Sequence, residues 1–340
     1  MGATLRELIA PYRSVSIIGM CKNAGKTTAL NSMIRQYRDG GETLALTSIG
    51  RDGEAQDLVT GTHKPGIYVP AGTLIATASE LLLRHCDVTR EILDTTGIST
   101  PMGDVVLFRA RSDGAVQLAG PSINSQLATV RDAFFRMGAD RVLIDGALSR
   151  KSLCSRAVTE ATVLCTGASY HKNLDVVVED TAYQCHILTL PENEDLRLQQ
   201  VNEDFRGILL AGEGVLQSVP AAVSVADALR TPEAQGVDTV FFGGALSDFA
   251  VKPLLMANTL PKNLRLVVRD SSKILLRREH YEKLLRRGIS VQVLQSVNLV
   301  ALTVNPFSAY GYSCGKEELL ERMRKCVDVP VINVLGEDGL

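Results

Sequence analysis

A glycine-rich stretch behind an apolar run constrains the fold of this chain more than any other feature. Residues 15–18 form the apolar run VSII, and residues 19–28 read GMCKNAGKTT. Beyond them, apolar residues recur at helical spacing as far as Tyr37. Small residues allow backbone N–H groups to surround a polyphosphate, and a lysine followed by a threonine provides a cation and a Mg²⁺ ligand. The sequence therefore predicts a strand, a phosphate-binding loop and a helix, in this order.

The residues of this loop have distinct expected roles. Lys26 is expected to reach the terminal phosphates and to act in catalysis, and Thr27 is expected to ligate Mg²⁺. The loop is one residue longer than the usual pattern, because Met20 stands where the first of two glycines is normally found. The intact AGKTT run favours a local variation of the loop over a chance lysine in a glycine turn. The residues expected to bind the nucleotide are Asn23, Ala24, Gly25, Lys26, Thr27 and Thr28.

Composition excludes several classes of function. The chain has 340 residues, of which 45% are hydrophobic, so it can bury a sizeable α/β core. A formal net charge of −2 provides no positive field for nucleic acid, and no apolar run is long enough to cross a bilayer. The seven cysteines are scattered without a C-x-x-C pair, which predicts thiols rather than a zinc site. We expect a cytoplasmic protein that binds neither nucleic acid nor membrane.

Strand-like and helix-like segments alternate along the first half of the chain. Residues 43–48, 141–145 and 161–165 read as buried strands, and a helix is expected to begin near Ser122. The turn dipeptide Asp113-Gly114 predicts that the strands at 105–108 and 115–118 form a hairpin. This alternation predicts a mostly parallel sheet with helices on both faces and ligands at the carboxyl ends of its strands.

The composition shifts after residue 190, where Glu, Asp and Gln become frequent. A second series of strands and helices follows and is Rossmann-like in pattern. We therefore expect a nucleotide-binding domain over residues 1–200, a helical connector over 201–236 and a smaller α/β domain over 237–340.

Two aspartates are candidates for the metal and for catalysis. Asp145 ends a predicted strand and Asp52 follows another, so both belong to the edge of the sheet that carries the loop. A carboxylate there can hold Mg²⁺ or orient water, although an ordinary polar turn has the same appearance. Two further strand-end loops, 166–172 and 305–312, could line a ligand site or be surface turns. No Asn-Lys-x-Asp guanine signature occurs, so ATP is preferred over GTP.

The loop and the Asp145-Gly146-Ala147 run resemble those of dethiobiotin synthetases and cobyric-acid-type amidotransferases. This resemblance implies a P-loop NTPase domain of the class that includes metallochaperone GTPases. The chain departs from both enzyme families. The synthetases carry a lysine-containing substrate loop where residues 49–52 read IGRD, and no nucleophile elbow surrounds Cys314 or Cys326. An ATP-dependent ligase that acts on a small carboxylic acid stays the alternative function.

The runs LIDGALSR at 143–150 and TGASY at 166–170 resemble the P-loop subunits of the lysine 5,6-aminomutase reactivases. Here the likeness extends along the whole chain. The resemblance implies a Mg²⁺-dependent nucleoside triphosphate hydrolase that restores an adenosylcobalamin-dependent aminomutase. It also implies a MutS-like ATPase partner. A homodimer and a nucleotide-binding module without turnover are left open.

Overall fold

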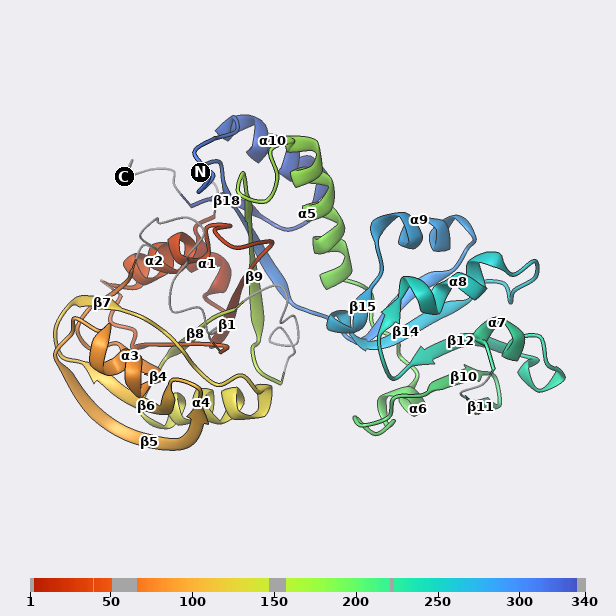
Figure 1. The fold of residues 1–340 in the computed structure, drawn as a ribbon, viewed down its shortest axis with the longest axis horizontal. Coiled ribbons are helices and arrows are strands. Elements are labelled where there is room, and N and C mark those ends of the chain that lie inside the picture. Colours follow the sequence, from red (N-terminus) through yellow and green to blue (C-terminus); the bar gives the residue numbers. More distant parts are fainter. Residues whose placement is uncertain (1–2, 39, 51–65, 147–156, 221–222, 335–340) are drawn as a thin grey trace. The chain divides into compact units, whose positions relative to one another are not determined.

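The computed structural model describes residues 3–38, 40–50, 66–146, 157–220 and 223–334, and the chain divides into two compact units (Figure 1). Unit 1 contains residues 1–185 together with 298–340, and unit 2 contains residues 186–297. Unit 2 is therefore inserted between two parts of unit 1 in the sequence.

Unit 1 is built on a nine-stranded sheet in the order β18-β17-β9-β1-β8-β2-β4-β6-β5. All neighbours from β18 to β4 run parallel, whereas β6 pairs antiparallel with both β4 and β5. The expected α/β fold with a mostly parallel sheet is confirmed. The strands are β1 (Ser14–Gly19), β2 (Leu44–Ser48), β4 (Leu74–Ala78), β5 (Arg90–Thr100), β6 (Gly103–Ala110), β8 (Arg141–Asp145), β9 (Ala161–Gly167), β17 (Leu299–Asn305) and β18 (Val331–Asn333).

Helices cover both faces of this sheet, with α2 (Lys26–Tyr37) and α4 (Asn124–Arg136) on opposite sides (Figure 1). The helical spacing read from the sequence is confirmed, because α2 buries Leu30, Met33 and Ile34 against a core that also contains Val15 and Ile17 of β1. The other helices in the described part of this unit are α1 (Leu5–Ile9), α3 (Ser79–Arg84), α5 (Leu174–Leu188), which continues into unit 2, and α10 (Lys316–Cys326).

The hairpin expected around Asp113-Gly114 was wrong. The strand after the turn, β7 (Gly114–Val116), pairs antiparallel with β3 (Ile67–Val69), and β6 instead forms its hairpin with β5. The Asp113 carboxylate explains the difference, because it accepts a hydrogen bond from the backbone N–H of Ala71 at 2.9 Å and pairs with Arg38. The turn is thus joined to distant segments rather than to its preceding strand.

Unit 2 contains a five-stranded sheet in the order β11-β10-β12-β14-β16. The last three strands are parallel, and β10 runs antiparallel to β11 and β12. Its core includes Leu198, Ala211, Phe241 and Val267. The strands are β10 (Ile208–Gly212), β11 (Val215–Val219), β12 (Val237–Phe242), β14 (Arg265–Asp270) and β16 (Ser290–Gln295), with a short pair of β13 (Leu246–Ser247) and β15 (Ile274–Leu275).

Short helices complete unit 2, and α8 (Asp248–Met256) and α9 (Arg278–Arg286) are the longest of those that lie wholly within its described residues. The others are α6 (Leu196–Gln199), α7 (Val225–Ala228) and the 3₁₀ turns η2 (Pro232–Ala234) and η3 (Ser271–Lys273). In the described parts of both units, no helix is both long and apolar enough to cross a membrane.

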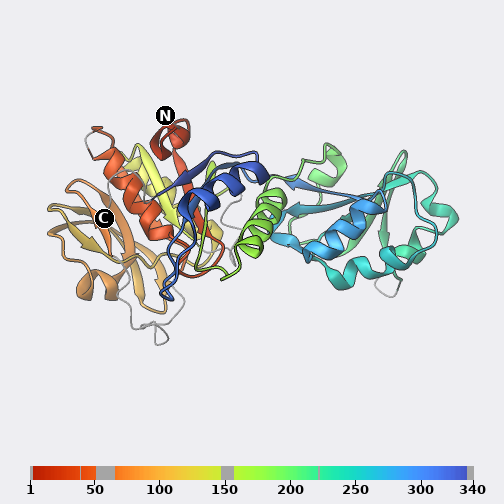
Figure 2. The same cartoon turned by 90° about the horizontal axis from the view of Figure 1, so that it is seen from above.

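The observed units differ from the expected domain boundaries at 200 and 237. The segment 201–236 is not a helical connector where it is described, because β10 and β11 form a hairpin there. The chain after residue 297 also leaves the second sheet, since β17 pairs with β9 and β18 with β17 in unit 1. Figures 1 and 2 show these blue C-terminal strands beside the green and red strands of the first sheet. The units are therefore assembled by pairing of distant strands.

Candidate functional site: the carboxyl edge of the first sheet

The glycine-rich loop lies between β1 and α2 at the centre of the nine-stranded sheet. β1 is flanked by β8 and β9, with Ile17 in register with Asp145 and Gly19 in register with Cys165. Two backbone hydrogen bonds continue this pairing past the strand ends. The N–H of Met20 donates to the carbonyl of Cys165, and the N–H of Gly146 donates to that of Ile17, both at 2.8 Å. The predicted strand, loop and helix are confirmed, and the loop is held by both neighbours.

The loop takes a tightly turned backbone path into α2. Asn23 has φ 61° and Gly25 has φ 92°, so both lie in the left-handed region, where glycine is unstrained. Gly25 is the N-cap of α2, and no described side chain caps this helix end. The first N–H groups of a helix have no intrahelical acceptor, and they carry the positive end of the helix dipole. The end of α2 thus has the chemistry of an anion site.

The Lys26 side chain crosses back over the start of the loop. A Cβ placed on Gly19 would lie 2.9 Å from Cγ of Lys26 and 3.2 Å from its Cδ, so the lysine stem lies against this glycine. Burial raises the pKa of the nearby Cys21 thiol, and the Lys26 charge acts in the opposite direction. The ammonium therefore stands at the loop, where a phosphate held by the α2 N-terminus would meet it.

Asp145 is the last residue of β8, the strand that pairs in parallel with β1. Its register partner on β2 is Ser48, and its carbonyl accepts a hydrogen bond from Ile49 N–H at 2.9 Å. The buried Cys165 thiol senses both charges of the site. Burial raises its pKa to about 11, the Lys26 charge lowers it, and the Asp145 carboxylate raises it further. Because one thiol is influenced by both groups, Lys26 and Asp145 occupy the same end of the sheet.

The end of β17 completes the site from the far end of the sequence. A Cβ on Gly25 would lie 3.1 Å from Cβ of Asn305, so this asparagine packs directly against the loop. The Asn305 carbonyl accepts a hydrogen bond from Ala168 N–H at 2.9 Å, and a Cβ on Gly167 would overlap that carbonyl. The sequence indicated residues 305–312 and 166–172 as strand-end loops but did not connect them to each other or to the glycine-rich loop. The sequence shows Gly25 and Gly167, but it does not show that Asn305 packs against both of them.

These two loops form one wall beside the glycine-rich loop. Ser169 Oγ accepts a hydrogen bond from Ala309 N–H at 3.1 Å, and the Lys172 ammonium lies 5.7 Å from the centroid of the Tyr312 ring. The Tyr170 hydroxyl donates to Asp180 at 2.9 Å. Burial and this carboxylate raise the pKa of Tyr170 to about 12, and Cys21 of the loop adds to the effect. The rings of Phe307 and Tyr310 are largely exposed on this wall.

His171, in the loop 166–172, belongs to the same wall but is exposed. Its Nδ1 accepts a hydrogen bond from Asn173 N–H at 3.0 Å, which makes it part of a turn.

The oxygen donors of the site suit Mg²⁺ better than a transition metal. Thr27 is the second residue of α2, and Asp145 provides a carboxylate whose Oδ1 is buried. A hydroxyl and a carboxylate are hard ligands, and Mg²⁺ normally completes its shell with phosphate oxygens and water. No group of three or more His, Cys, Asp or Glu side chains suitable for a metal occurs in the described parts of the chain. The residues present would therefore fit a magnesium ion.

Most of the residues predicted for the site lie together at this edge. The loop residues from Asn23 to Thr28 and Asp145 are brought to one place, whereas Asp52, with Arg51 and Glu54, lies outside the described residues.

Comparisons of the chain with protein-family models, with curated proteins and with solved structures find no match. The geometry and the sequence are therefore the grounds for a functional conclusion.

Proposed function

We propose that unit 1 is a P-loop domain that binds and hydrolyses a nucleoside triphosphate with Mg²⁺. The observation that carries the proposal is the Lys26 stem folded over Gly19 at the start of α2, with Asp145 at the end of the adjacent strand β8. An uncapped helix N-terminus, a lysine and a carboxylate at one sheet edge are the groups that phosphoryl transfer requires.

The residues divide the work by their chemistry. The N–H groups at the start of α2 bind the phosphate oxygens and orient the chain of phosphates. Lys26 offsets the negative charge that develops on the terminal phosphates. Thr27 and Asp145 hold Mg²⁺, which would screen the phosphate charge. Asp52 is a further candidate to hold the ion or to orient the attacking water, as the sequence predicts.

The wall formed by residues 166–172 and 305–312 is proposed to receive the nucleoside. Tyr170, Phe307 and Tyr310 provide aromatic surface beside the phosphate loop, and aromatic rings stack on nucleobases. ATP is proposed over GTP because the guanine signature is absent from the sequence. This assignment also explains why β17 returns to the first sheet, since that return is what brings Asn305 to Gly25.

The hydrolysis is proposed to serve the reactivation of an adenosylcobalamin-dependent aminomutase, together with a MutS-like ATPase partner in the cytoplasm. The support for this role is the resemblance carried by residues 143–150 and 166–170. The second candidate is an ATP-dependent ligase for a small carboxylic acid. It is favoured by the nine-residue span from Gly19 to Thr27 and by Asp145-Gly146, which such enzymes share.

Substitution of Lys26 tests the nucleotide site. Lys26→Ala removes the charge that offsets the phosphates, so we expect the affinity for ATP in the presence of Mg²⁺ to fall at least about 100-fold by calorimetric titration. The matched control is Lys316→Ala, at the exposed start of α10, which should bind like the wild type. Equal ATP and GTP titrations for the Lys26 variant and the wild type would refute the site.

The coupling of hydrolysis distinguishes the two candidate functions. A reactivase should hydrolyse ATP slowly alone and faster when a purified aminomutase is added. A ligase should release ADP only when a small carboxylic acid is present. If turnover depends strictly on the acid and ignores the aminomutase, the reactivase proposal fails while the nucleotide site stands.

A further inference from the structure

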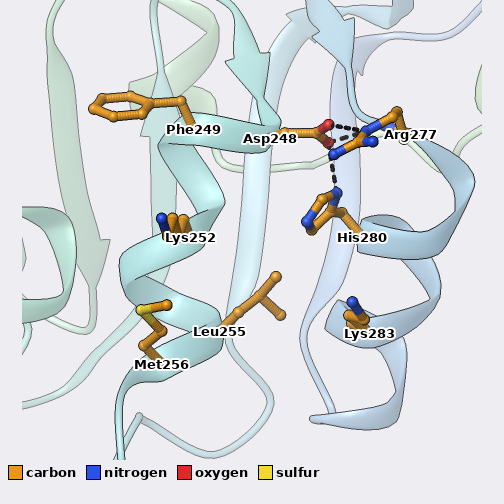
Figure 3. Close-up of a pocket in the computed structure, with 8 residues that line it drawn as sticks. All are labelled: Asp248, Phe249, Lys252, Leu255, Met256, Arg277, His280 and Lys283. Carbon is orange, nitrogen blue, oxygen red and sulfur yellow. Dashed lines mark hydrogen bonds and ion pairs between the residues drawn. The ribbon is translucent and has the colours of Figure 1, made fainter.

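A groove between α8 and α9 of unit 2 lies outside the nucleotide site. It has a volume of about 390 Å³ (Figure 3). Its two sides belong to helices that are joined in the sequence only through β14 and the β15 segment. The residues that line it are Asp248, Phe249, Lys252, Leu255, Met256, Arg277, His280 and Lys283.

Polar contacts hold the two helices together at both ends of the groove. At one end, Arg277 Nε donates to Asp248 Oδ2 at 2.6 Å, and His280 Nδ1 lies 3.1 Å from the other carboxylate oxygen, as the dashed lines in Figure 3 show. At the other end, the Arg287 guanidinium donates to the carbonyls of Leu255 and Ala257 at the end of α8. The groove is therefore preformed, and an occupant need not order it.

The charge of the groove is positive. Asp248 is its one acidic lining residue among the described side chains, and Arg277 and His280 already contact it. Lys252 on α8 and Lys283 on α9 have no ion pair in the described part of the chain, and they flank the groove from its two sides (Figure 3). Two ammonium groups are thus available to carboxylates of an incoming molecule.

Apolar side chains are exposed along α8. Met256 is 70% exposed and Phe249 is 86% exposed, while Leu255 points from α8 toward α9 (Figure 3). The Phe249 ring is directed away from α9, to the other side of α8. Exposed Phe and Met side chains on one helix are enriched at protein interfaces relative to the rest of the protein surface.

We propose that the α8–α9 groove binds an acidic amphipathic segment of a partner protein. Apolar side chains of that segment pack on Leu255, Met256 and Phe249, and its carboxylates pair with Lys252 and Lys283. A small anion would use the lysines but leave the apolar side chains exposed, so the combined surface favours a peptide segment. This inference goes beyond nucleotide hydrolysis and does not require it.

A pair of labelled peptides tests the groove on the full-length protein. The probe is an 18-residue fluorescein-labelled helical peptide with leucines three and four positions apart and glutamates elsewhere, and its counterpart carries lysines in place of the glutamates. We expect the acidic peptide to bind the wild type by fluorescence anisotropy. The double variant K252E/K283E should bind it at least tenfold more weakly and should prefer the lysine peptide.

Matched variants separate charge from apolar contact. K316E/K325E makes the same charge change on exposed positions of α10 and should leave the binding of the acidic peptide unaltered. F249S/M256S changes only exposed side chains and should also weaken it at least tenfold. Thermal melting checks that each variant is folded.

Three results would overturn the proposal. One is a wild type that does not bind the acidic peptide at about 1 mM, the range of very weak association. Another is equal affinity of the wild type and K252E/K283E. The third is binding that is lost in K252E/K283E for phosphatidylserine vesicles or inorganic triphosphate but not for the peptide, which would assign the lysines to a membrane or to a small anion.

Discussion

The two sheets of this protein share a strand pattern but use the carboxyl ends of their strands differently. In unit 1, β8 ends in Asp145 and is followed by Gly146, beside a loop that leads into an uncapped helix. In unit 2, β14 ends in Asp270, and β12 is followed by Gly243 and then by a GALS run at 244–247 that repeats residues 146–149. In the sequence the two edges share the GALS run, but Gly243 stands where the first edge has Asp145, and no glycine-rich loop precedes the second.

In unit 2 these strand-end groups are used by the fold itself. The Asp270 carboxylate accepts a hydrogen bond from Ser272 N–H at 2.7 Å and caps a 3₁₀ turn. Gly243 N–H donates to the carbonyl of Gly207 at 2.9 Å, and a Cβ on Gly243 would overlap the carbonyl of Phe205. The Asp270 carboxylate is thus engaged in the local structure of its own turn, which argues against a role in chemistry for it.

The largest expected effect separates the two strand-end aspartates. Asp145→Asn removes a carboxylate from the proposed Mg²⁺ site, so we expect Mg²⁺-dependent ATP hydrolysis to fall roughly 100-fold. Asp270→Asn keeps a side chain that caps turns well and should leave hydrolysis unchanged. Steady-state phosphate release measures both variants. Equal losses of ATP hydrolysis in the two variants would show that the two strand-end aspartates do not differ in function.

A smaller effect is expected when one glycine at the edge of each sheet is replaced, Gly19 in unit 1 and Gly243 in unit 2. Gly19→Ala places a methyl group against the flexible Lys26 stem, so the lysine shifts and ATP affinity should fall about tenfold with little loss of stability. Gly243→Ala meets backbone at Phe205 and should cost about 1–3 kcal/mol of unfolding free energy. Its ATP affinity should be unaltered. Calorimetric titration measures the ATP affinity, and urea unfolding measures the free energy of unfolding. A loss of stability in Gly19→Ala together with a loss of ATP affinity in Gly243→Ala would contradict the geometry.

The smallest expected effect is a pH dependence of unit 2. Nε2 of His186 lies 2.6 Å from the Tyr281 hydroxyl, and burial lowers the pKa of His186 below the usual value of 6.5. The unfolded chain therefore takes up this proton more readily than the folded chain. The contribution of His186 to the stability of unit 2 should be fully present above about pH 6.5, and it should decline as the pH falls below this value.

Hydrogen exchange of unit 2 amides checks this pH dependence. His186→Phe should flatten it, whereas His171→Phe, at an exposed position of unit 1, should not. A decline of equal size in the His186 variant would show that other groups cause it.

Local elements followed from the sequence where nearby residues decide them. The helix after the glycine-rich loop, the strand 141–145 and the helix that begins at Asn124 were predicted because their apolar residues recur at one period. The Asp113-Gly114 hairpin and the helical connector failed because strand pairing competes with turn chemistry. An apolar strand such as β7 can pair with any strand that offers a matching face, and here it pairs with β3.

The sequence by itself determined that a strand, a glycine-rich loop and a helix follow one another at residues 14–37, and that an aspartate ends a buried strand at Asp145. Only the tertiary structure decided that β17 returns to the first sheet and sets Asn305 against Gly25. The physical reason is the range of the interactions. Backbone conformation and helical spacing depend on residues a few positions apart, whereas the site depends on register between strands more than a hundred residues apart, which only the packed core selects.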